Sequence, residues 1–345
     1  MGTIGGIFSN ELALSTANGF FSRICPSGSD VSFMMSGRCG IYRCLLDLAQ
    51  RDTRKVAYVP MYTCETVLAP FLKAGYQLRF YEVDRQLHSV FDPAVLEEIS
   101  VLSLCGYYGF SNYDHDFVRR CKDRGVTIFE DATHSILSAD GIDPLCDYVA
   151  GSFRKWMGVP CGGFAIKYGG SFTVPCLPVD PTHLELRRKA IETGDGDVFW
   201  EGEMLLRRMF DCHSGDETSE HILRYADLET ISRRRRENFQ ALLDGMPQAP
   251  QGFSPVFSSL PEGTVPSHFV LYADDRPHLQ EFLKERDIRS TVYWPKAEVV
   301  DLTGHDTVAY IYDHIVAVPC DQRYTPADMG RITDALGAYA QASRA

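Results

Sequence analysis

The sequence lacks the features that would direct a protein to a membrane or to nucleic acid. No apolar run approaches the roughly 20 residues that a membrane-spanning helix requires. The N-terminus has no basic start followed by an apolar block, so we expect no signal peptide. Positive charge is scarce as well, because the 345 residues carry a net charge of −12 at pH 7. That balance argues against a nucleic-acid partner, since phosphate binding needs a basic field.

Paired cysteines and metal-binding patterns are also missing. The 11 cysteines are an odd number and are scattered without a CxxC pair. Free thiols of this kind are typical of a reducing compartment, so we predict a cytoplasmic protein. The histidines are equally dispersed, and no HExxH motif or Cys/His cluster predicts a metal site.

What the sequence does contain is an alternation of short apolar runs and amphipathic segments. With 45% hydrophobic residues, the chain can bury a substantial core. The continuous apolar runs predict strands at residues 55–60, 78–84, 101–109, 126–132, 147–153 and 162–168. Helices are predicted between strands at residues 64–75 and 114–125, and each ends at a glycine. This order predicts an α/β domain with a largely parallel sheet.

The chain changes character after about residue 175. Residues 182–246 look mostly helical, and the Pro/Gly-rich passage 246–263 predicts turns or a linker. A small α+β unit is predicted from the segments that follow, which are residues 267–273, 275–287, 288–295, 315–321 and a final helix from Pro326. We therefore predict three parts: an N-terminal segment (1–30), a large domain (31–246) and a small C-terminal domain (247–345).

Four consecutive arginines, Arg233–Arg236, lie in the helical region. They could be a basic patch for an anionic partner. Because the chain is acidic overall and glutamates lie nearby, we interpret them as a solvated helix face.

Two stretches place polar groups where ligands bind in α/β proteins. In "SGRCG", Ser36 and Gly37 precede an apolar helix, and the unpaired N–H groups of a helix start suit a phosphate. In "TIFEDATHS", an apolar strand ends in Glu130 and Asp131, at the edge where open α/β sheets bind ligands. A buried Asp131 would need a cationic partner. Ordinary helix caps would explain both patterns, so neither decides a function alone.

Lys155 stands out among the eight lysines of the chain. It lies 24 residues after Asp131, which is one helix-plus-strand unit, and three residues after Ser152, whose hydroxyl could hold a phosphate oxygen. The other lysines fall in polar helical segments or flank strands. In a partly desolvated, cation-rich site the amine form of a lysine is favoured, and a Schiff-base lysine requires that form. The junction "VPMYTCETV" adds Tyr62 as a stacking surface.

A phosphate turn, an acidic strand end, a lysine and then a glycine pair resemble the layout of fold-type I pyridoxal-phosphate enzymes. The chain is similar in particular to the DegT/StrS group of sugar aminotransferases. The stretches that carry this resemblance are "SGRCGIYRCL", "VPMYTCETVLAPFLKAGYQLRFYEVD", "FEDATHSI", "GSFRKWMGVPCGGFAI", "RRRRENFQALL" and "VPCDQRYTPADMGRITDAL". They span residues 34 to 340. The resemblance implies a fold-type I transferase with a large, mostly parallel seven-stranded sheet domain and a small α+β C-terminal domain.

The resemblance implies a role for each matched residue. Lys155 would form a Schiff base with pyridoxal 5′-phosphate and move the proton, and Asp131 would pair with the pyridinium nitrogen. His134 would contact the hydroxyl side of the ring. The phosphate would be held by the side chain of Ser152 and by backbone around Gly37, Arg38 and Cys39.

Two departures concern the ring and the substrate. Cys64 occupies a position that is often aromatic in the family, so stacking on the ring would come from Tyr62 or not at all. Arg38, Arg154 and Arg323 could clamp a carboxylate or a phosphate that a standard sugar enzyme does not need, although ordinary ion pairs would also explain them. We predict substrate contacts from three residues: Tyr108, Arg154 and Arg323.

The resemblance implies a pyridoxal-phosphate-dependent aminotransferase. An amino donor, with glutamate as the candidate, would pass its amino group to a keto group of a nucleotide-sugar or secondary-metabolite precursor. Two alternatives stay open: a lyase, decarboxylase or oxidase acting on an amino acid, and a cofactor-binding regulatory protein without turnover. We expect small-molecule partners, no metal, no membrane or nucleic acid, and a homodimer with shared active sites.

Overall fold

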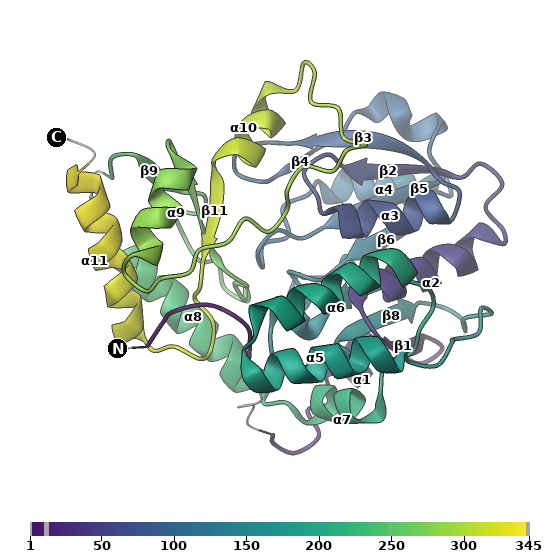
Figure 1. Ribbon diagram of the computed structural model, residues 1–345. Helices are drawn as coiled ribbons and strands as arrows, with labels where there is room; N and C mark the ends of the chain where they lie inside the picture. The colour runs from purple at the N-terminus through teal and green to yellow at the C-terminus, as the bar shows by residue number, and fades with distance from the viewer. Residues whose placement is uncertain (1, 10–13, 249, 343–345) are drawn as a thin grey trace.

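The structure is a computed structural model that describes residues 2–9, 14–248 and 250–342. Its large sheet has eight strands (Figure 1). In spatial order they are β1 (Asp30–Met34), β8 (Gly163–Lys167), β7 (Tyr148–Ser152), β6 (Thr127–Asp131), β5 (Val101–Cys105), β2 (Val56–Pro60), β3 (Gln77–Val83) and β4 (Ser89–Val90). The predicted α/β class is confirmed, but the count of seven strands becomes eight. The sequence predicted six of them and missed both edge strands, because β4 is too short to form a pattern and β1 mixes polar and apolar residues.

The sheet is mostly parallel, as predicted. Strands β3, β2, β5, β6 and β7 run parallel, and β8 is antiparallel between β7 and β1. Strands β5 and β7 are buried along their whole length, as expected for a parallel sheet that is covered on both faces. The helices are α1 (Phe20–Ile24), α2 (Gly37–Ala49), α3 (Glu65–Lys73), α4 (His115–Asp123), α5 (Pro181–Thr193), α6 (Gly196–Met209), α7 (Glu217–Tyr225), α8 (Leu228–Asp244), α9 (Arg276–Lys284), α10 (Asp306–His314) and α11 (Pro326–Ala342).

A second, antiparallel sheet lies with α8, α9 and α11 at the left of Figure 1. Its strands are β11 (Ile315–Val318), β10 (Phe269–Ala273) and β9 (Phe253–Pro255). Residues 288–295 do not form the predicted strand. They make only two isolated bridges, Ile288 to Ile4 and Thr291 to Ala317. The rings of Tyr293 and Trp294 pack against His134 instead.

The small domain was predicted to begin at residue 247, and that boundary stays a prediction. Helix α8, which precedes it, packs against α11 near the C-terminus. Within the described residues, no helix is long and apolar enough to cross a lipid bilayer.

Strand register brings the ends of neighbouring strands to one edge of the large sheet. Asp131 pairs with Ala150 across β6 and β7. Ser152, two residues beyond Ala150, pairs with Gly163 of β8, and Gly163 pairs with Met34 of β1. The acidic end of β6, the end of β7 and the turn after β1 therefore meet.

Glycines allow the start of α2 to lie directly on this edge. A Cβ atom on Gly40 would lie 2.3 Å from the carbonyl oxygen of Phe164. One on Gly163 would lie 2.2 Å from the carbonyl oxygen of Ser36. Both distances are far shorter than real Cβ contacts, so α2 reaches this position only because both side chains are absent.

Candidate active site

Lys155 ends a single turn of 3-10 helix, η2 (Phe153–Lys155), that begins directly after β7. The Ser152 hydroxyl caps this turn by accepting from the N–H of Arg154 at 3.3 Å. The Lys155 Nζ atom lies 4.8 Å from the centre of the Tyr293 ring. The predicted lysine therefore sits at the edge of the sheet where β7 ends, and it faces the segment that carries Tyr293.

Several charges act on the Lys155 amine. Burial lowers the pKa of Lys155, and the charges of Arg154 and Arg187 add to this effect while Glu203 opposes it. Lowering the pKa makes the neutral amine easier to reach than in a surface lysine. This agrees with the cation-rich environment that the sequence suggested.

Arg235 holds the backbone of the lysine turn. Its guanidinium is fully buried and donates to the carbonyl oxygens of Lys155 at 3.4 Å, Trp156 at 3.2 Å and Ser267 at 2.7 Å. It also lies 4.7 Å above the Trp156 ring. The interpretation of Arg233–Arg236 as a solvated face is therefore wrong for Arg235, which ties the lysine turn to the start of β10.

Asp131 and Glu130 point to opposite faces of the sheet, as successive strand residues must. The Asp131 Oδ1 atom accepts from the N–H of Thr133 at 3.0 Å and from its hydroxyl at 2.6 Å. Burial raises the pKa of Asp131, and the Thr133 hydrogen bonds and the Lys155 charge oppose that rise. Glu130 accepts from the Tyr113 hydroxyl at 2.7 Å, and burial raises its pKa to about 7. Only Asp131 therefore belongs to the Lys155 site.

His134 is a buried, neutral imidazole with one nitrogen still free. Its Nδ1 atom lies 3.0 Å from the Ser267 hydroxyl. Its Nε2 atom is buried, and no described residue bonds to it. Burial, followed by the charges of Lys155 and Arg235, lowers the pKa of His134 well below its usual value. A free, neutral imidazole nitrogen next to a lysine is suited to contact a ligand.

A chain of polar side chains links His134 to the neighbour of Lys155. The Ser267 hydroxyl also lies 3.2 Å from Nδ1 of His268, and Nε2 of His268 lies 2.6 Å from the Tyr293 hydroxyl. The sequence did not predict roles for Ser267, His268 or Tyr293. These residues reach the site from a part of the chain more than 110 residues after Lys155, and nothing in their local pattern marks that contact.

The start of α2 offers unpaired backbone N–H groups beside Ser152. Among the described residues, the N–H groups of Gly37 and Arg38 have no hydrogen-bond partner, whereas Cys39 donates to the Ser36 hydroxyl at 3.2 Å. A Cβ atom on Gly37 would lie 3.1 Å from that of Ser152. Two free N–H groups, the positive end of the helix and a hydroxyl suit an anion. The Cys39 N–H could bind a phosphate, as predicted, only if its hydrogen bond to the Ser36 hydroxyl opened.

The predicted aromatic residues meet, but not as an open stacking surface. Tyr62 is fully buried and stacks on Tyr107 with 5.6 Å between ring centres. Its hydroxyl lies 3.3 Å from the Tyr108 hydroxyl. The Tyr108 ring packs edge-on against His134 at 5.5 Å. Cys64 caps α3, and its sulfur accepts from the hydroxyl of the residue two positions on at 3.0 Å. The ligand roles of Tyr62, Cys64 and Tyr108 stay predictions.

The three predicted arginines have different surroundings. Arg154 pairs with Glu203 of α6. The side chain of Arg38 is buried below α6, where it donates to the carbonyl oxygen of Leu206 at 3.4 Å. Arg323 pairs with Asp321 through two bonds of 2.8 and 2.9 Å and also donates to two backbone carbonyls of the N-terminal segment. A substrate role for Arg323, which stays a prediction, would require it to give up these contacts.

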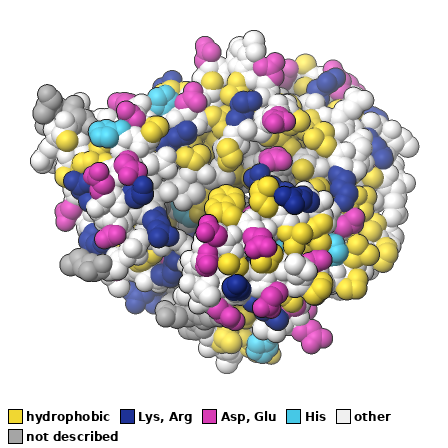
Figure 2. Space-filling model, viewed as in Figure 1, with side chains coloured by type: hydrophobic (Ala, Val, Ile, Leu, Met, Phe, Trp, Pro, Cys, Tyr) yellow, Lys and Arg dark blue, Asp and Glu magenta, His cyan; other side chains and the backbone are white. Residues whose placement is uncertain are grey.

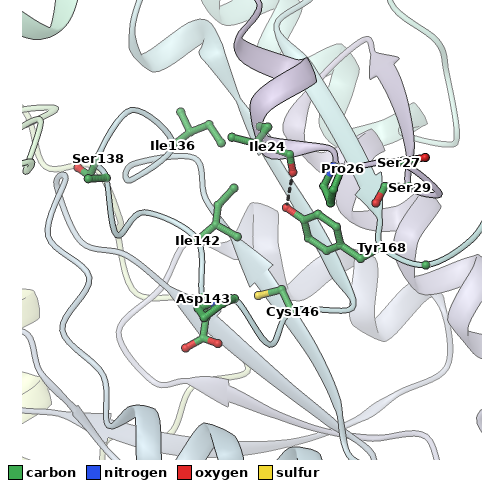
Figure 3. Close-up of a pocket in the computed structure, with 13 residues that line it drawn as sticks. Ile24, Pro26, Ser27, Ser29, Ile136, Ser138, Ile142, Asp143, Cys146 and Tyr168 are labelled. Atoms are coloured by element: carbon green, nitrogen blue, oxygen red, sulfur yellow. Dashed lines mark hydrogen bonds between the residues drawn. The ribbon is translucent and has the colours of Figure 1, made fainter.

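A cavity of about 500 Å³ opens away from these residues (Figure 3). It lies between the end of α1, the loop after β6 and the end of β8, and no predicted site residue lines it. Two of its larger polar groups are already bonded: the Tyr168 hydroxyl donates to the carbonyl of Ile24 at 2.9 Å, and Asp143 lies 2.7 Å from Nδ1 of His115. We therefore do not take this cavity as the active site, because no predicted site residue lines it.

Comparison with known proteins identifies the fold. No family model and no curated protein sequence matches the chain. Among solved structures, DesV from S. venezuelae, in complex with a ketimine intermediate, superposes with a TM-score of 0.67 at 18% identity, over 94% of this chain and 88% of DesV. The chain shares the DesV fold, and two further structures identify that fold as an aminotransferase fold.

Two further structures agree. PseC from Helicobacter pylori, an aminotransferase involved in pseudoaminic acid biosynthesis, has a TM-score of 0.71 at 10% identity and covers 99% of this chain and 100% of PseC. A putative sugar aminotransferase from Streptococcus pneumoniae, in its PMP form, has a TM-score of 0.66 at 12% identity over 98% of this chain and 92% of that one. These similarities confirm the predicted fold class. With identities this low they establish the fold, and the function must be argued from the residues.

Proposed function

We propose that this protein is a pyridoxal 5′-phosphate-dependent aminotransferase in which Lys155 carries the cofactor. The observation that supports this most directly is the meeting of three groups at one edge of the sheet. They are the buried Lys155 amine, the buried carboxylate of Asp131, and the unpartnered Nε2 atom of His134. The sugar aminotransferases of the same fold, some solved in PLP and PMP forms, agree with the proposal.

The described residues fit the chemical groups of this cofactor. Asp131 is an anion that can pair with a protonated ring nitrogen, and such a pairing offsets the cost of its burial. His134 can contact a ring oxygen through its free nitrogen. The start of α2 and the Ser152 hydroxyl can hold a phosphate. These are the pyridinium, hydroxyl and phosphate groups of pyridoxal phosphate.

When bound, the cofactor supplies an electron sink for the carbon that bears the amino group. The lowered pKa of Lys155 favours the neutral amine, which can act both as a nucleophile and as a proton carrier. The Ser152 cap and the Arg235 hydrogen bonds fix the backbone of the turn from which this amine projects. The protein thus supplies a positioned base and a fixed electrostatic environment.

We assign the substrates from the solved structures that share the fold. PseC is described as an aminotransferase of pseudoaminic acid biosynthesis, and the Streptococcus protein is described as a putative sugar aminotransferase. The acceptor we propose is a keto group of a nucleotide-sugar or secondary-metabolite precursor. Glutamate is the amino donor in this proposal.

We also propose a homodimer. Trp200 and Met204 lie one helical turn apart on the outer face of α6, with 59% and 42% of their surfaces exposed. Hydrophobic side chains gather around α6 on this face of the molecule (Figure 2). The inner face of the same helix carries Glu203, whose charge acts on Lys155. A second copy packed on α6 would therefore adjoin the active site.

A cytoplasmic location completes the proposal. In the described residues all 11 cysteines are free thiols. Such a chain is suited to a reducing compartment.

Covalent labelling tests the cofactor assignment. Protein incubated with pyridoxal phosphate, reduced with borohydride and digested should carry the cofactor mass on the peptide that contains Lys155. The variant Lys155→Ala should lose both the label and all turnover. The matched control Lys189→Ala, an exposed lysine on α5, should keep both. Label on another lysine, or full activity of Lys155→Ala, would refute the assignment.

The amino donor separates transamination from the other chemistries. Glutamate should convert the bound cofactor to its amine form in a single turnover, seen as loss of the visible absorption band. If no donor does this while an amino acid is still consumed, a lyase, decarboxylase or oxidase replaces the proposal.

A further inference from the structure

The helical hairpin α5–α6 brings two arginines and one glutamate against the lysine turn. Arg154 and Arg187 both donate to the carboxylate of Glu203, and both use the same oxygen, Oε1. The Arg187 bond is 2.8 Å long. A guanidinium fork matches a carboxylate best when two parallel N–H groups each take a different oxygen. Here each fork uses one N–H group on Glu203, so much of its donor capacity is unused.

The same place collects buried polar atoms without partners. The Nε atoms of Arg154 and Arg187 are buried and unbonded among the described residues, and so are both ring nitrogens of His183. Arg187 is only 4% exposed and His183 is fully buried. Burial, together with the charges of Arg154 and Arg187, lowers the pKa of His183 to about 3, so this ring is neutral and holds one N–H donor. Buried donors are normally satisfied, so their concentration here indicates a missing acceptor.

Positive charge exceeds negative charge around Glu203, which also indicates a missing anion. Although burial opposes it, the charges of Arg154 and Arg187 lower the pKa of Glu203 to about 2, so its carboxylate is ionised. Burial and the Arg154 charge lower the pKa of Arg187 to about 9, which leaves it charged at neutral pH. Lys155 and Arg38 also face Glu203. Asp131 also faces Lys155, and Glu65 also faces Arg38. Arg154 and Arg187, however, share the one carboxylate of Glu203, and a second anion would be attracted.

We propose that Arg154 and Arg187, with His183, bind the carboxylate of the amino donor, and that Glu203 takes its place when the donor has left. This inference rests on the proposed aminotransferase function. Arg154 directly precedes Lys155, the residue at which the amino group reacts, and in an amino acid the carboxylate is attached to the carbon that bears that group. Arg154 and Arg187 both bond to Glu203, and the charges of all three residues act on the Lys155 amine, so an anion that replaces Glu203 would place the reacting carbon near that amine.

The exchange explains how one site serves two different substrates. A keto sugar without a carboxylate would leave two buried arginines unpaired, which is costly. Glu203, which projects from α6 with 22% of its side chain exposed, neutralises them during that half of the reaction. The donor carboxylate displaces it in the other half.

Binding of glutarate to the cofactor-free protein tests the inference without turnover. Glutarate is a dicarboxylate that lacks the amino group, and titration calorimetry measures its affinity directly. Arg187→Gln should weaken the affinity by about tenfold or more, because one of two charge-assisted contacts is lost. Arg188→Gln is the matched control, since Arg188 is the next residue of α5 and its partly exposed side chain pairs with Asp216 at 3.0 Å rather than with Glu203. It should stay within about twofold of the parent.

Glu203→Gln supplies a gain that misfolding cannot imitate. Removing the Glu203 charge, which competes with glutarate for the arginines, should tighten glutarate binding by roughly fivefold. In the loaded enzyme, Arg187→Gln should raise KM for glutamate and leave KM for the keto substrate unchanged.

Three results would overturn the inference. The first is that Arg187→Gln and Arg188→Gln bind glutarate equally well. The second is that Glu203→Gln does not bind glutarate more tightly than the parent. The third is that the parent binds inorganic phosphate more tightly than glutarate and that Arg187→Gln removes this preference. Covalent labelling of Lys155 is measured separately. Failure of the labelling removes the proposed function, whereas normal labelling with a failed glutarate test removes only the carboxylate site.

Discussion

Arg235 and Lys155 are neighbouring cations of the site, and the sequence pointed to only one of them. Lys155 follows a strand that belongs to a recognisable series, so its position near a sheet edge could be inferred. Arg235 lies in a run of four arginines on a helix, and the face of α8 that is buried depends on which elements pack against it. Its role became visible only through its contacts with Trp156 and Ser267.

Replacing Arg235 should destabilise the protein. Arg235→Met leaves several buried carbonyl oxygens without a donor, and we expect the free energy of unfolding to fall by about 3 kcal/mol. Arg233→Met is the control, because Arg233 is exposed and pairs with Glu237 at the surface. That change should cost less than about 0.5 kcal/mol. Urea unfolding curves measure both, and equal losses would show that Arg235 is not the anchor of the lysine turn.

Among elements, α2 shows how backbone contact replaces side-chain packing. This helix begins at the site edge, and it approaches β8 so closely that Gly40 has no room for a Cβ atom. The sequence predicted the helix start correctly from "SGRCG" and an apolar run. It did not predict the closeness of the contact, because the position of the opposing carbonyl is set by a strand more than a hundred residues later.

Two glycine-to-alanine changes should therefore have opposite signs. Gly40→Ala drives a methyl group into the Phe164 carbonyl, and overpacking of this kind should cost about 2 kcal/mol or more and weaken cofactor binding at the start of α2. Gly337→Ala, in the interior of α11, meets nothing within 4 Å. It should stabilise the protein by about 1 kcal/mol through helix propensity. Thermal unfolding distinguishes them, and a stabilising Gly40→Ala would contradict the close contact.

At the scale of the whole molecule, two distant parts of the chain, which we predict to be two domains, contribute to one site. The large sheet supplies Lys155, Asp131 and His134, and the small domain supplies the Ser267–His268–Tyr293 chain. Relative movement of the two parts would change the surroundings of Lys155 directly. In our proposal a second copy of the chain packs on the exposed apolar face of α6 and so adjoins the same site.

Charge on that face should break the proposed dimer. Trp200→Glu combined with Met204→Glu places two carboxylates in an apolar interface, and the protein should then run in light scattering as a monomer of 38.7 kDa. Val299→Glu, at an exposed apolar residue outside α6, should leave the mass unchanged. A parent protein that is already monomeric, or a charged variant that stays dimeric, would rule out α6 as the interface.

The sequence by itself determined the order of strands and helices, the acidic strand end at Asp131 and the position of Lys155. Such features are local: an apolar run, a glycine cap or a residue that follows a strand is written in neighbouring letters. This local pattern was sufficient for the α/β class and for most of the large sheet.

Tertiary structure decided what surrounds those residues. Arg187, Glu203, Arg235 and Tyr293 come to Lys155 from segments 32 to 138 residues farther along the chain. Whether each of them is a solvated charge or a buried contact depends on how the helices pack on the sheet, and burial is a property of that packing rather than of the residue. The physical reason is that desolvation and pairing are set by neighbours in space.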